Sequence, residues 1–174
     1  MKITELKNEI ALLSRAELEA LLLQLYRKNS ECKELIEAKF DPESEARVFE
    51  KYKKQIASEF FPDRGFGRLR YSFMRKALKN FKDISTNHEL IAELMMTHVE
   101  KGVAFTNEYG DIDERFYDNI AGMYEKALRY ITDHNLKTNF IQRCRAIVDQ
   151  TRGIGWGFHD ELGELYYSYF SEDT

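Results

Sequence analysis

The sequence predicts an all-α fold of about nine helices, stacked as antiparallel hairpins in an irregular, helical-repeat-like superhelix. Apolar residues recur every three or four positions almost throughout, and no stretch alternates apolar and polar residues for long enough to form a strand. The 174 residues include only 2 prolines and 9 glycines, so few residues interrupt regular structure. Because the connections between the expected helices are short, consecutive helices are expected to run antiparallel.

Three short helices are expected in residues 1–40. Ser14 and Glu17 have the spacing of a capping box, which ends the first helix and starts the second. Ser30 is expected to cap the third helix. The second helix carries four leucines that are expected to form its buried stripe: Leu18, Leu21, Leu22 and Leu25.

Longer helices are expected from residue 41 onward. Asp41 can cap the fourth helix, because the following Pro42 suits the first helical position, and this helix is expected to run to about Phe60. The segment 62–67, which contains proline and glycine, breaks the pattern. The fifth helix then reaches about Asp83, with four side chains expected to point inward: Phe73, Ala77, Leu78 and Phe81.

Capping residues also predict the sixth and seventh helices. Thr86 and Glu89 form a second capping box, which starts the sixth helix. Asp111 and Asp113 follow a glycine, and either of them can cap the seventh helix. A calcium loop would place its glycine after the first acids and a glutamate at its twelfth position, so capping explains these aspartates better. Asn135 is expected to end the seventh helix.

A glycine-rich corner is expected between the eighth and ninth helices, at Gly153, Gly155 and Gly157. A dinucleotide-binding loop would follow a strand and would place its third glycine three residues after the second, and neither condition holds here. We therefore expect Gly153 to end the eighth helix in a left-handed conformation. The corner is expected to let Trp156 and Phe158 turn inward.

The alternating helix directions predict which loops lie together. The loops at 61–68, 106–113 and 153–159 are expected at one end of the stack, and those at 83–87 and 134–135 at the other. The first set contains six of the nine glycines: Gly65, Gly67, Gly110, Gly153, Gly155 and Gly157. A functional site is therefore expected at the glycine-rich end.

The chain is expected to form a single all-α domain over residues 1–174, with a short-helix subregion at 1–40 and a long-helix stack at 41–174. Its longest apolar run, Ala20 to Leu23, is far too short for a membrane span. Cys32 and Cys144 lie in periodic apolar segments, which indicates reduced thiols and a cytoplasmic location. Residues 171–174 are expected to fray. The oligomeric state stays open.

The net charge of −4 hides two opposite blocks. Residues 83–125 carry two basic and ten acidic side chains. Residues 64–82 carry seven basic side chains and no acidic one: Arg64, Arg68, Arg70, Arg75, Lys76, Lys79 and Lys82. Either the two blocks neutralise each other as neighbouring helices, or the first is a phosphate-binding stripe beside an acidic groove.

The basic block has the composition of a single-stranded nucleic-acid binder, because aromatic residues interleave its cations. Those aromatics are Phe66, Tyr71, Phe73 and Phe81, and most of them are expected on the buried side. Four basic residues of the block are spaced to share one helix face: Arg68, Arg75, Lys79 and Lys82. With Arg64, these four are the candidate anion-binding residues.

Six residues near the glycine-rich loops are candidates for binding a ligand: Asn107, Asp111, Asp113, Trp156, His159 and Asp160. A histidine beside carboxylates can act as a general acid or base near neutral pH. No nucleophile accompanies His159, so no catalytic residue is assigned and an enzyme is the less expected outcome. His98 is expected to be a core residue. No histidine or cysteine has the spacing of metal ligands, so neither a metal nor another cofactor is expected.

Two strings resemble an uncharacterised bacterial family of domain-of-unknown-function proteins: Gly102-Val-Ala-Phe-Thr-Asn-Glu-Tyr-Gly-Asp-Ile-Asp-Glu-Arg-Phe-Tyr117 and Thr151-Arg-Gly-Ile-Gly-Trp-Gly-Phe-His-Asp160. The leucine-rich opening, from Glu5 through Ser14 to Glu19, resembles the same family. The resemblance covers most of the chain. It implies a small, helical, cytoplasmic protein, and it assigns no activity and no catalytic residue.

The absence of a recognisable catalytic motif favours a non-enzymatic helical interaction scaffold, which binds a protein or peptide partner through a groove or an end surface. One alternative is phosphate or single-stranded nucleic-acid binding through residues 64–82. A second alternative is a small-ligand or hydrolytic pocket at the glycine-rich loops.

Overall fold

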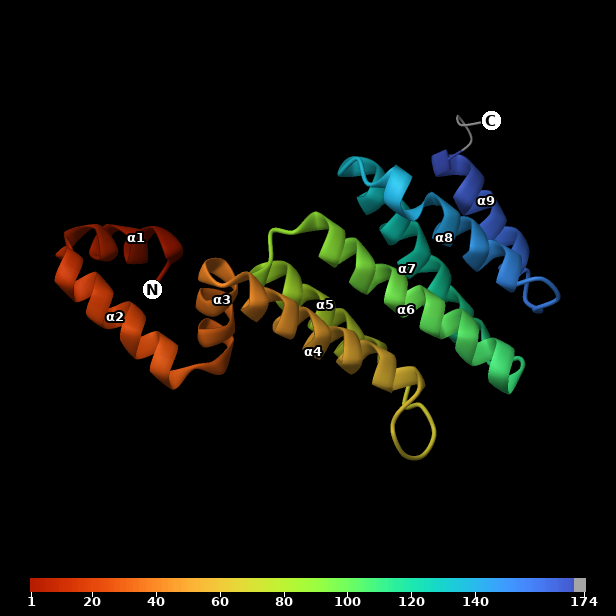
Figure 1. Cartoon of the computed structure of the whole chain (residues 1–174), viewed down its shortest axis with the longest axis horizontal. Coiled ribbons are helices and arrows are strands. Elements are labelled where there is room, and N and C mark those ends of the chain that lie inside the picture. The colour runs from red at the N-terminus through yellow and green to blue at the C-terminus, as the bar shows by residue number, and fades with distance from the viewer. Residues whose placement is uncertain (171–174) are drawn as a thin grey trace. The chain divides into compact units, whose positions relative to one another are not determined.

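The structure, a computed structural model, describes residues 1–170, and this part of the chain contains nine helices and no strand. The helices are α1 (Ile3–Leu12), α2 (Arg15–Lys28), α3 (Ser30–Phe40), α4 (Pro42–Phe60), α5 (Tyr71–Ile84), α6 (His88–Tyr109), α7 (Glu114–Asp133), α8 (Lys137–Gln150) and α9 (Phe158–Phe170) (Figure 1). The prediction of an all-α fold is confirmed. The expected fraying of residues 171–174 lies outside the described residues.

Several helices begin where the sequence predicts. The capping box at α2 is formed, because Ser14 Oγ accepts a hydrogen bond from Glu17 N at 3.3 Å and Glu17 Oε2 accepts one from Ser14 N at 2.8 Å. Asp113 caps α7, since its Oδ1 accepts a hydrogen bond from Phe116 N at 2.8 Å. Pro42 is the first residue of α4.

Two caps lie one residue away from their predicted positions. Asn29, not Ser30, caps α3 with a hydrogen bond of 3.0 Å to its Oδ1, and Ser30 is already the first helical residue. Asn87, not Thr86, caps α6, and its Oδ1 accepts hydrogen bonds of 3.1 and 3.2 Å from two amides of the first turn. An asparagine is as good a cap as a serine or threonine, so neighbouring residues of these types leave the boundary ambiguous in sequence.

Contacts between residues divide the chain into two compact units, Met1–Val48 and the part from Phe49 onward. The first unit contains α1, α2, α3 and the beginning of α4. The second contains the rest of α4 and helices α5 to α9. That the whole chain forms a single domain stays a prediction.

In the first unit, α2 packs against α3. Tyr26 Oη on α2 donates a hydrogen bond to Glu37 Oε1 on α3 at 2.7 Å. No residue of α1, α2 or α3 is buried. The predicted burial of the leucine stripe on α2 is therefore wrong: Leu21, Leu22 and Leu25 are exposed, and Leu18 is half-buried. The periodic spacing puts these leucines on one face of α2, but the helices of this unit leave that face largely exposed.

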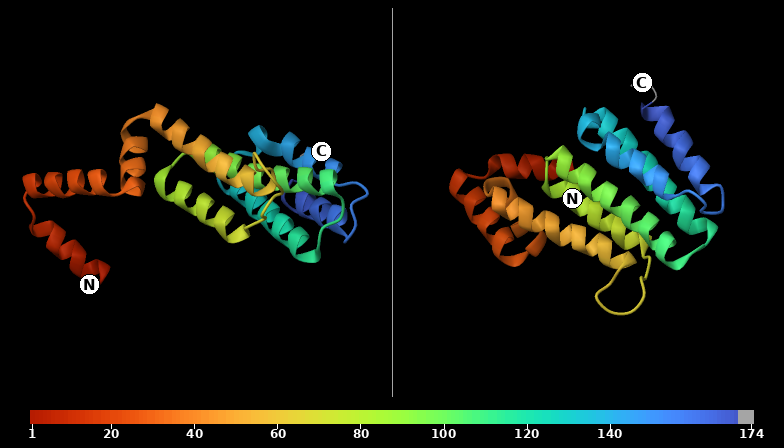
Figure 2. Two further views of the ribbon diagram at one scale, coloured as in Figure 1. Left: turned by 90° about the horizontal axis from the view of Figure 1, so that it is seen from below. Right: turned by 45° about the vertical axis from the view of Figure 1, so that its right-hand side comes forward.

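The second unit has a continuous apolar core, to which α6 contributes along most of its length. Helix α6 lies side by side with α7 (Figures 1 and 2), and α7 also packs against α9. The close approach of α6 and α7 requires a glycine, because a Cβ at Gly102 would lie 2.3 Å from Ile120 Cδ1. Helix α7 is also tied to α8, since the buried Tyr124 Oη donates a hydrogen bond of 2.8 Å to the carbonyl of Cys144.

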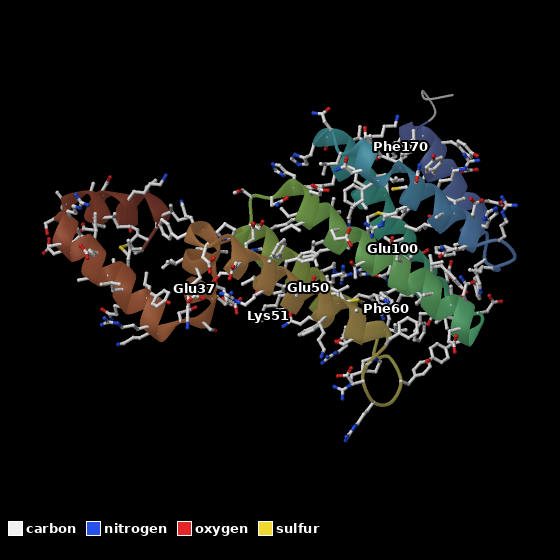
Figure 3. The ribbon with its side chains drawn as sticks, viewed as in Figure 1. Glu37, Glu50, Lys51, Phe60, Glu100 and Phe170 are labelled. Carbon is white, nitrogen blue, oxygen red and sulfur yellow. The ribbon has the colours of Figure 1, made fainter. Side chains whose placement is uncertain are left out.

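A cluster of charged side chains joins α8 to α6. Arg143 donates hydrogen bonds to Glu93 and to Glu100, and its Nε lies 2.9 Å from Glu100 Oε1 (Figure 3 labels Glu100). Lys53 on α4 adds a second cation 3.3 Å from Glu93 Oε1. Burial acts to raise the pKa of Glu93, but Arg143 and then Lys53 outweigh it and hold that pKa below its usual value. These two acidic side chains of the 83–125 block are therefore neutralised from α8 and α4.

Helix α5 buries a different set of side chains from the one predicted. Ala77, Leu78 and Phe81 are buried as expected, but Phe73 is 38% exposed and Met74 is fully buried in its place. The guanidinium of Arg70 lies over the Phe73 ring, 4.8 Å from its centroid. Phe73 and Met74 are adjacent apolar residues, so periodicity alone does not decide which one enters the core.

Candidate functional site

Of the three loops that were predicted to share one end of the stack, the first contacts the second and the second contacts the third. The ring of Phe66 in the first loop has its centroid 4.7 Å from that of Tyr109 at the start of the second. A Cβ at Gly155 in the third loop would lie 3.2 Å from Asp111 Oδ2 in the second. The loops at the glycine-rich end therefore form a cluster.

Asp111 belongs to a hydrogen-bond network around the buried Tyr117. Tyr117 Oη donates to Asp111 Oδ1 at 3.2 Å and accepts from Ile112 N at 3.3 Å. It also lies 2.9 Å from Thr106 Oγ1. The ring of Trp156 packs with its centroid 6.5 Å from that of Tyr117. Asp111 and Trp156 are therefore brought together at Tyr117, in an arrangement that holds the loops in place.

The corner between α8 and α9 differs from the prediction in two ways. Helix α8 ends at Gln150, before Gly153, although Gly153 does have a left-handed φ of +83°. Phe158 is fully buried as expected, but Trp156 is 60% exposed. Trp156 itself has a φ of +64° and is followed by Gly157 with a φ of +68°, so the chain turns twice in the left-handed region and leaves the indole outside the core.

Asn107 and Asp113 are both used to satisfy helix ends. Asn107 Nδ2 donates a hydrogen bond of 3.0 Å to the carbonyl of Gln150, the last residue of α8. Asp113 accepts the amide hydrogen bond that starts α7.

His159 and Asp160 line an open depression of about 700 Å³ along α8 and α9, and the other four candidates do not line it. His159 Nδ1 lies 3.1 Å from the carbonyl of Val148 and 3.0 Å from Thr151 Oγ1. A carbonyl can only accept, so His159 Nδ1 donates the hydrogen bond to Val148. Two of the six ligand-binding candidates thus line this depression. Whether any of them binds a ligand stays a prediction.

Among residues 1–170, no three histidine, cysteine, aspartate or glutamate side chains are grouped so that they could hold a metal ion. In the same range, no helix is both long enough and apolar enough to cross a membrane.

The basic candidates do not share one helix face as predicted. Arg68 lies before α5, which begins at Tyr71, so it cannot belong to the face that carries Arg75, Lys79 and Lys82. Residues 66–70 form the irregular segment that precedes α5, and Leu69 within it has a left-handed φ of +51°.

The three basic candidates on α5 already have partners. Arg75 Nη1 donates to Asn119 Oδ1 at 3.1 Å, and Lys79 Nζ pairs with Asp83 Oδ2 at 2.5 Å. Lys82 Nζ lies 4.6 Å from the centroid of the Tyr130 ring. Burial, and after it the nearby Lys126, lowers the pKa of Lys82. These three side chains are therefore less available to a ligand than their sequence pattern indicates.

The loop between α4 and α5 is fixed by the buried carboxylate of Glu59. This carboxylate accepts hydrogen bonds from Arg70 N at 3.0 Å and from Arg70 Nη2 at 2.6 Å, and Leu69 N donates to the Glu59 carbonyl at 3.0 Å. Burial acts to raise the pKa of Glu59, but Arg70 outweighs it and holds that pKa below its usual value. At Gly67 a Cβ would lie 2.4 Å from the carbonyl oxygen of Phe60, so only glycine fits there.

Three exposed aromatic rings meet beside this loop, and we call them the aromatic platform: Phe61, Phe66 and Tyr109. The platform packs on the fully buried Phe105, whose ring centroid lies 5.8 Å from that of Phe61 and 5.1 Å from that of Phe66. Phe61 is 36% exposed, Phe66 59% and Tyr109 48%. Sequence reasoning missed the platform, because Phe61 and Tyr109 lie outside the basic block and most aromatics of that block were expected on the buried side.

The first unit carries a groove between α2 and α3, which we call the α2–α3 groove. Its volume is about 770 Å³. Its apolar lining comes from six residues: Leu18, Leu22, Leu23, Tyr26, Ile36 and Phe40. Charged residues of both signs stand at its edge: Arg15, Glu19 and Lys39. The sequence signal for this groove was present in the leucine-rich α2, but it was assigned to a buried stripe.

Comparison with known proteins supports the resemblance that the sequence strings indicate. A family model described as a family of unknown function, DUF6155, matches residues 1–170. The chain belongs to DUF6155. No curated protein and no solved structure matches the chain. Membership of DUF6155 therefore confirms the resemblance and assigns no function to the chain.

Proposed function

We propose that this DUF6155 protein is a non-enzymatic helical scaffold that binds an amphipathic helix of a partner protein in the α2–α3 groove. The observation that carries the proposal is the exposed apolar lining of this groove. Exposed contiguous apolar surface of this kind is uncommon on monomeric proteins and is typical of interaction sites.

Three of the six apolar side chains in the lining are exposed, and the other three are half-buried. Leu22 is 55% exposed, Leu23 45% and Phe40 79%. Covering one such side chain completely is worth about 1.5–3 kcal/mol, so a partner that covers several of them gains a large free energy of association. None of the helices α1 to α3 has a buried residue of its own, which means that this unit has much to gain from a partner.

The geometry and charge of the groove favour a helix as the occupant. Two packed helices present a cleft into which a third helix can lay its apolar face, with anchor residues at spacings of three and four. Arg15 and Lys39 at the edge suit acidic residues on that helix, and Glu19 suits a basic one. A partner helix with an apolar stripe and mixed charges beside it therefore complements this site.

A reducing compartment such as the cytoplasm is part of the same proposal. Cys144 is buried, Cys32 is half-buried, and both are free thiols in the structure. Free cysteines are typical of proteins that stay in a reducing environment.

Site-specific photo-crosslinking tests the proposal. A photoreactive phenylalanine analogue is placed at Leu22 in the groove, and at Leu12 as the matched control. Leu12 is a leucine of the same unit, 80% exposed, that does not line the groove. After irradiation in the source cells, the proposal expects a discrete polypeptide adduct at position 22 and much less at position 12. Equal adducts at both positions, or none at position 22, would contradict it.

A further inference from the structure

The second unit carries the aromatic platform, a surface separate from the α2–α3 groove of the first unit. Phe61 and Tyr109 are stacked with an interplanar angle of 28° and centroids 6.3 Å apart, and Phe66 meets Tyr109 edge-to-face at 4.7 Å. Because all three rings pack around the buried Phe105, their positions are set by the core. Phe66, the most exposed of the three, offers the largest free ring surface.

The loop that carries Phe66 is held in one conformation. Glu59 binds the end of the loop through the Arg70 amide and guanidinium, and Gly67 lies against the backbone of Phe60 at the end of α4 (Figure 3 labels Phe60). The loop extends beyond the helix ends of its own unit, where it follows α4 (Figure 1). A ligand that stacks on Phe66 therefore meets a preformed surface, and little conformational entropy is lost on binding.

Exposed cations accompany the platform. Arg64 and Arg68 lie two residues before and after Phe66, and both are exposed. Arg70 is paired with Glu59, whose pKa Arg68 also helps to lower. Lys101 Nζ lies 5.8 Å from the centroid of the Phe61 ring. The nearest acidic residues in sequence are Glu59, Asp63, Glu108 and Asp111, of which Glu59 pairs with Arg70 and Asp63 pairs with Lys54 at 3.7 Å. The platform therefore has three exposed cations close to it, Arg64 and Arg68 in sequence and Lys101 in space.

We propose that the aromatic platform and the flanking Arg64, Arg68 and Lys101 bind single-stranded nucleic acid. Unpaired bases stack on Phe66 and its neighbours, and the cations attract the phosphates that join those bases. Duplex is excluded as the preferred ligand, because paired bases do not offer their faces to a protein ring. A protein ligand is less favoured, because residues 64–82 carry seven basic side chains and no acidic one. This proposal uses residues of the second unit only and does not depend on the scaffold function.

Fluorescence anisotropy with short, fluorescein-labelled oligouridylate and oligothymidylate tests the proposal on the full-length protein. A hairpin duplex with the same label is the third probe. We expect both single strands to bind at low salt, the duplex to bind more weakly, and the affinity to fall as salt increases. Phe66→Ala is expected to weaken binding about tenfold, the size of one base-stacking contact. Removing Arg64 and Arg68 together is expected to make the slope of log affinity against log salt shallower by about 1.4.

The matched controls are Tyr167→Ala and Arg145→Ala. Tyr167 is 62% exposed on α9, and Arg145 is exposed on α8, so both remove the same side-chain types away from the platform. Both control variants are expected to bind like the parent protein. Absence of binding at low salt overturns the proposal. Equal binding of duplex and single strands, with no effect of Phe66→Ala, also overturns it, because the affinity is then purely electrostatic.

Discussion

The guanidinium of Arg70 donates a hydrogen bond of 2.6 Å to the carboxylate of Glu59, although eleven residues separate the two in sequence. Glu59 is 2% exposed and Arg70 about half exposed, so the pair brings one buried charge and one surface charge together at the root of the α4–α5 loop. The same carboxylate also binds the Arg70 amide. This contact positions Phe66 beside Tyr109.

Arg70→Ala is expected to destabilise the protein by about 2 kcal/mol at neutral pH, because it leaves the buried Glu59 carboxylate without its cation. Urea denaturation measures the loss, and Arg68→Ala serves as the neighbouring control with an expected change below about 0.5 kcal/mol. Arg70 holds the pKa of Glu59 low, so the stabilisation is present above the usual carboxyl range and is lost as pH falls through the folded pKa. Equal destabilisation by the two substitutions would show that the pair does not hold the loop.

Gly102→Ala is expected to destabilise the protein by about 1–3 kcal/mol, because the new Cβ meets the buried side chain of Ile120. Gly122→Ala on α7 is the matched control, since a Cβ there meets nothing within 4 Å. It is expected to stabilise the helix by up to about 1 kcal/mol. Thermal denaturation distinguishes the two. Shortening Ile120 to Val in the Gly102→Ala background is expected to recover part of the loss, and no recovery would mean that the two residues do not set the helix spacing.

Acidification is expected to destabilise the protein through His98. Burial first, and then Arg75 and Lys126, lowers the pKa of His98 to about 4, and its Nε2 is buried without a hydrogen-bond partner. Below pH about 6.5 the unfolded chain takes up a proton that the folded chain does not, so stability falls by about 1.4 kcal/mol per pH unit until about pH 4.

The substitution His98→Met removes the imidazole that takes up this proton, and it therefore tests the prediction. The difference in stability between pH 7 and pH 5, measured by urea denaturation, is expected to be about 2 kcal/mol smaller in this variant than in the parent protein. Because the change in stability between the two pH values is measured within each protein, a packing cost that does not depend on pH cancels. An identical pH dependence in both proteins would mean that His98 is protonated without cost.

Local features of the sequence predict the helices well, because periodicity and caps are short-range. Ser14 with Glu17 starts α2, and Asp113 starts α7, as expected. Errors of one residue arise where two capping types are adjacent, as at Asn87, which is preceded by Thr86. Helix direction also predicts which loops meet, and the contact of Gly155 with Asp111 agrees with it.

The sequence does not reveal which apolar surfaces are covered by other parts of the chain. The leucines of α2 form an apolar face in sequence, but only the structure shows that no helix of their unit buries them. The aromatic platform joins Phe61 and Phe66 of the α4–α5 loop to Tyr109 at the end of α6, and the pairing of Glu59 with Arg70 closes that loop. A contact between residues far apart in the chain produces no periodic pattern in the sequence, so the sequence could not predict that these three rings meet.

The scaffold account is tested most directly by the yield of the photo-crosslinked adduct at position 22 when Phe40 is changed to Glu. Phe40 lines the same groove and is 79% exposed, so this substitution places a charge in the groove without removing a core side chain. The account predicts that the adduct is lost while the circular dichroism spectrum of the protein is unchanged. An adduct of undiminished yield in the Phe40→Glu protein would contradict binding in the α2–α3 groove.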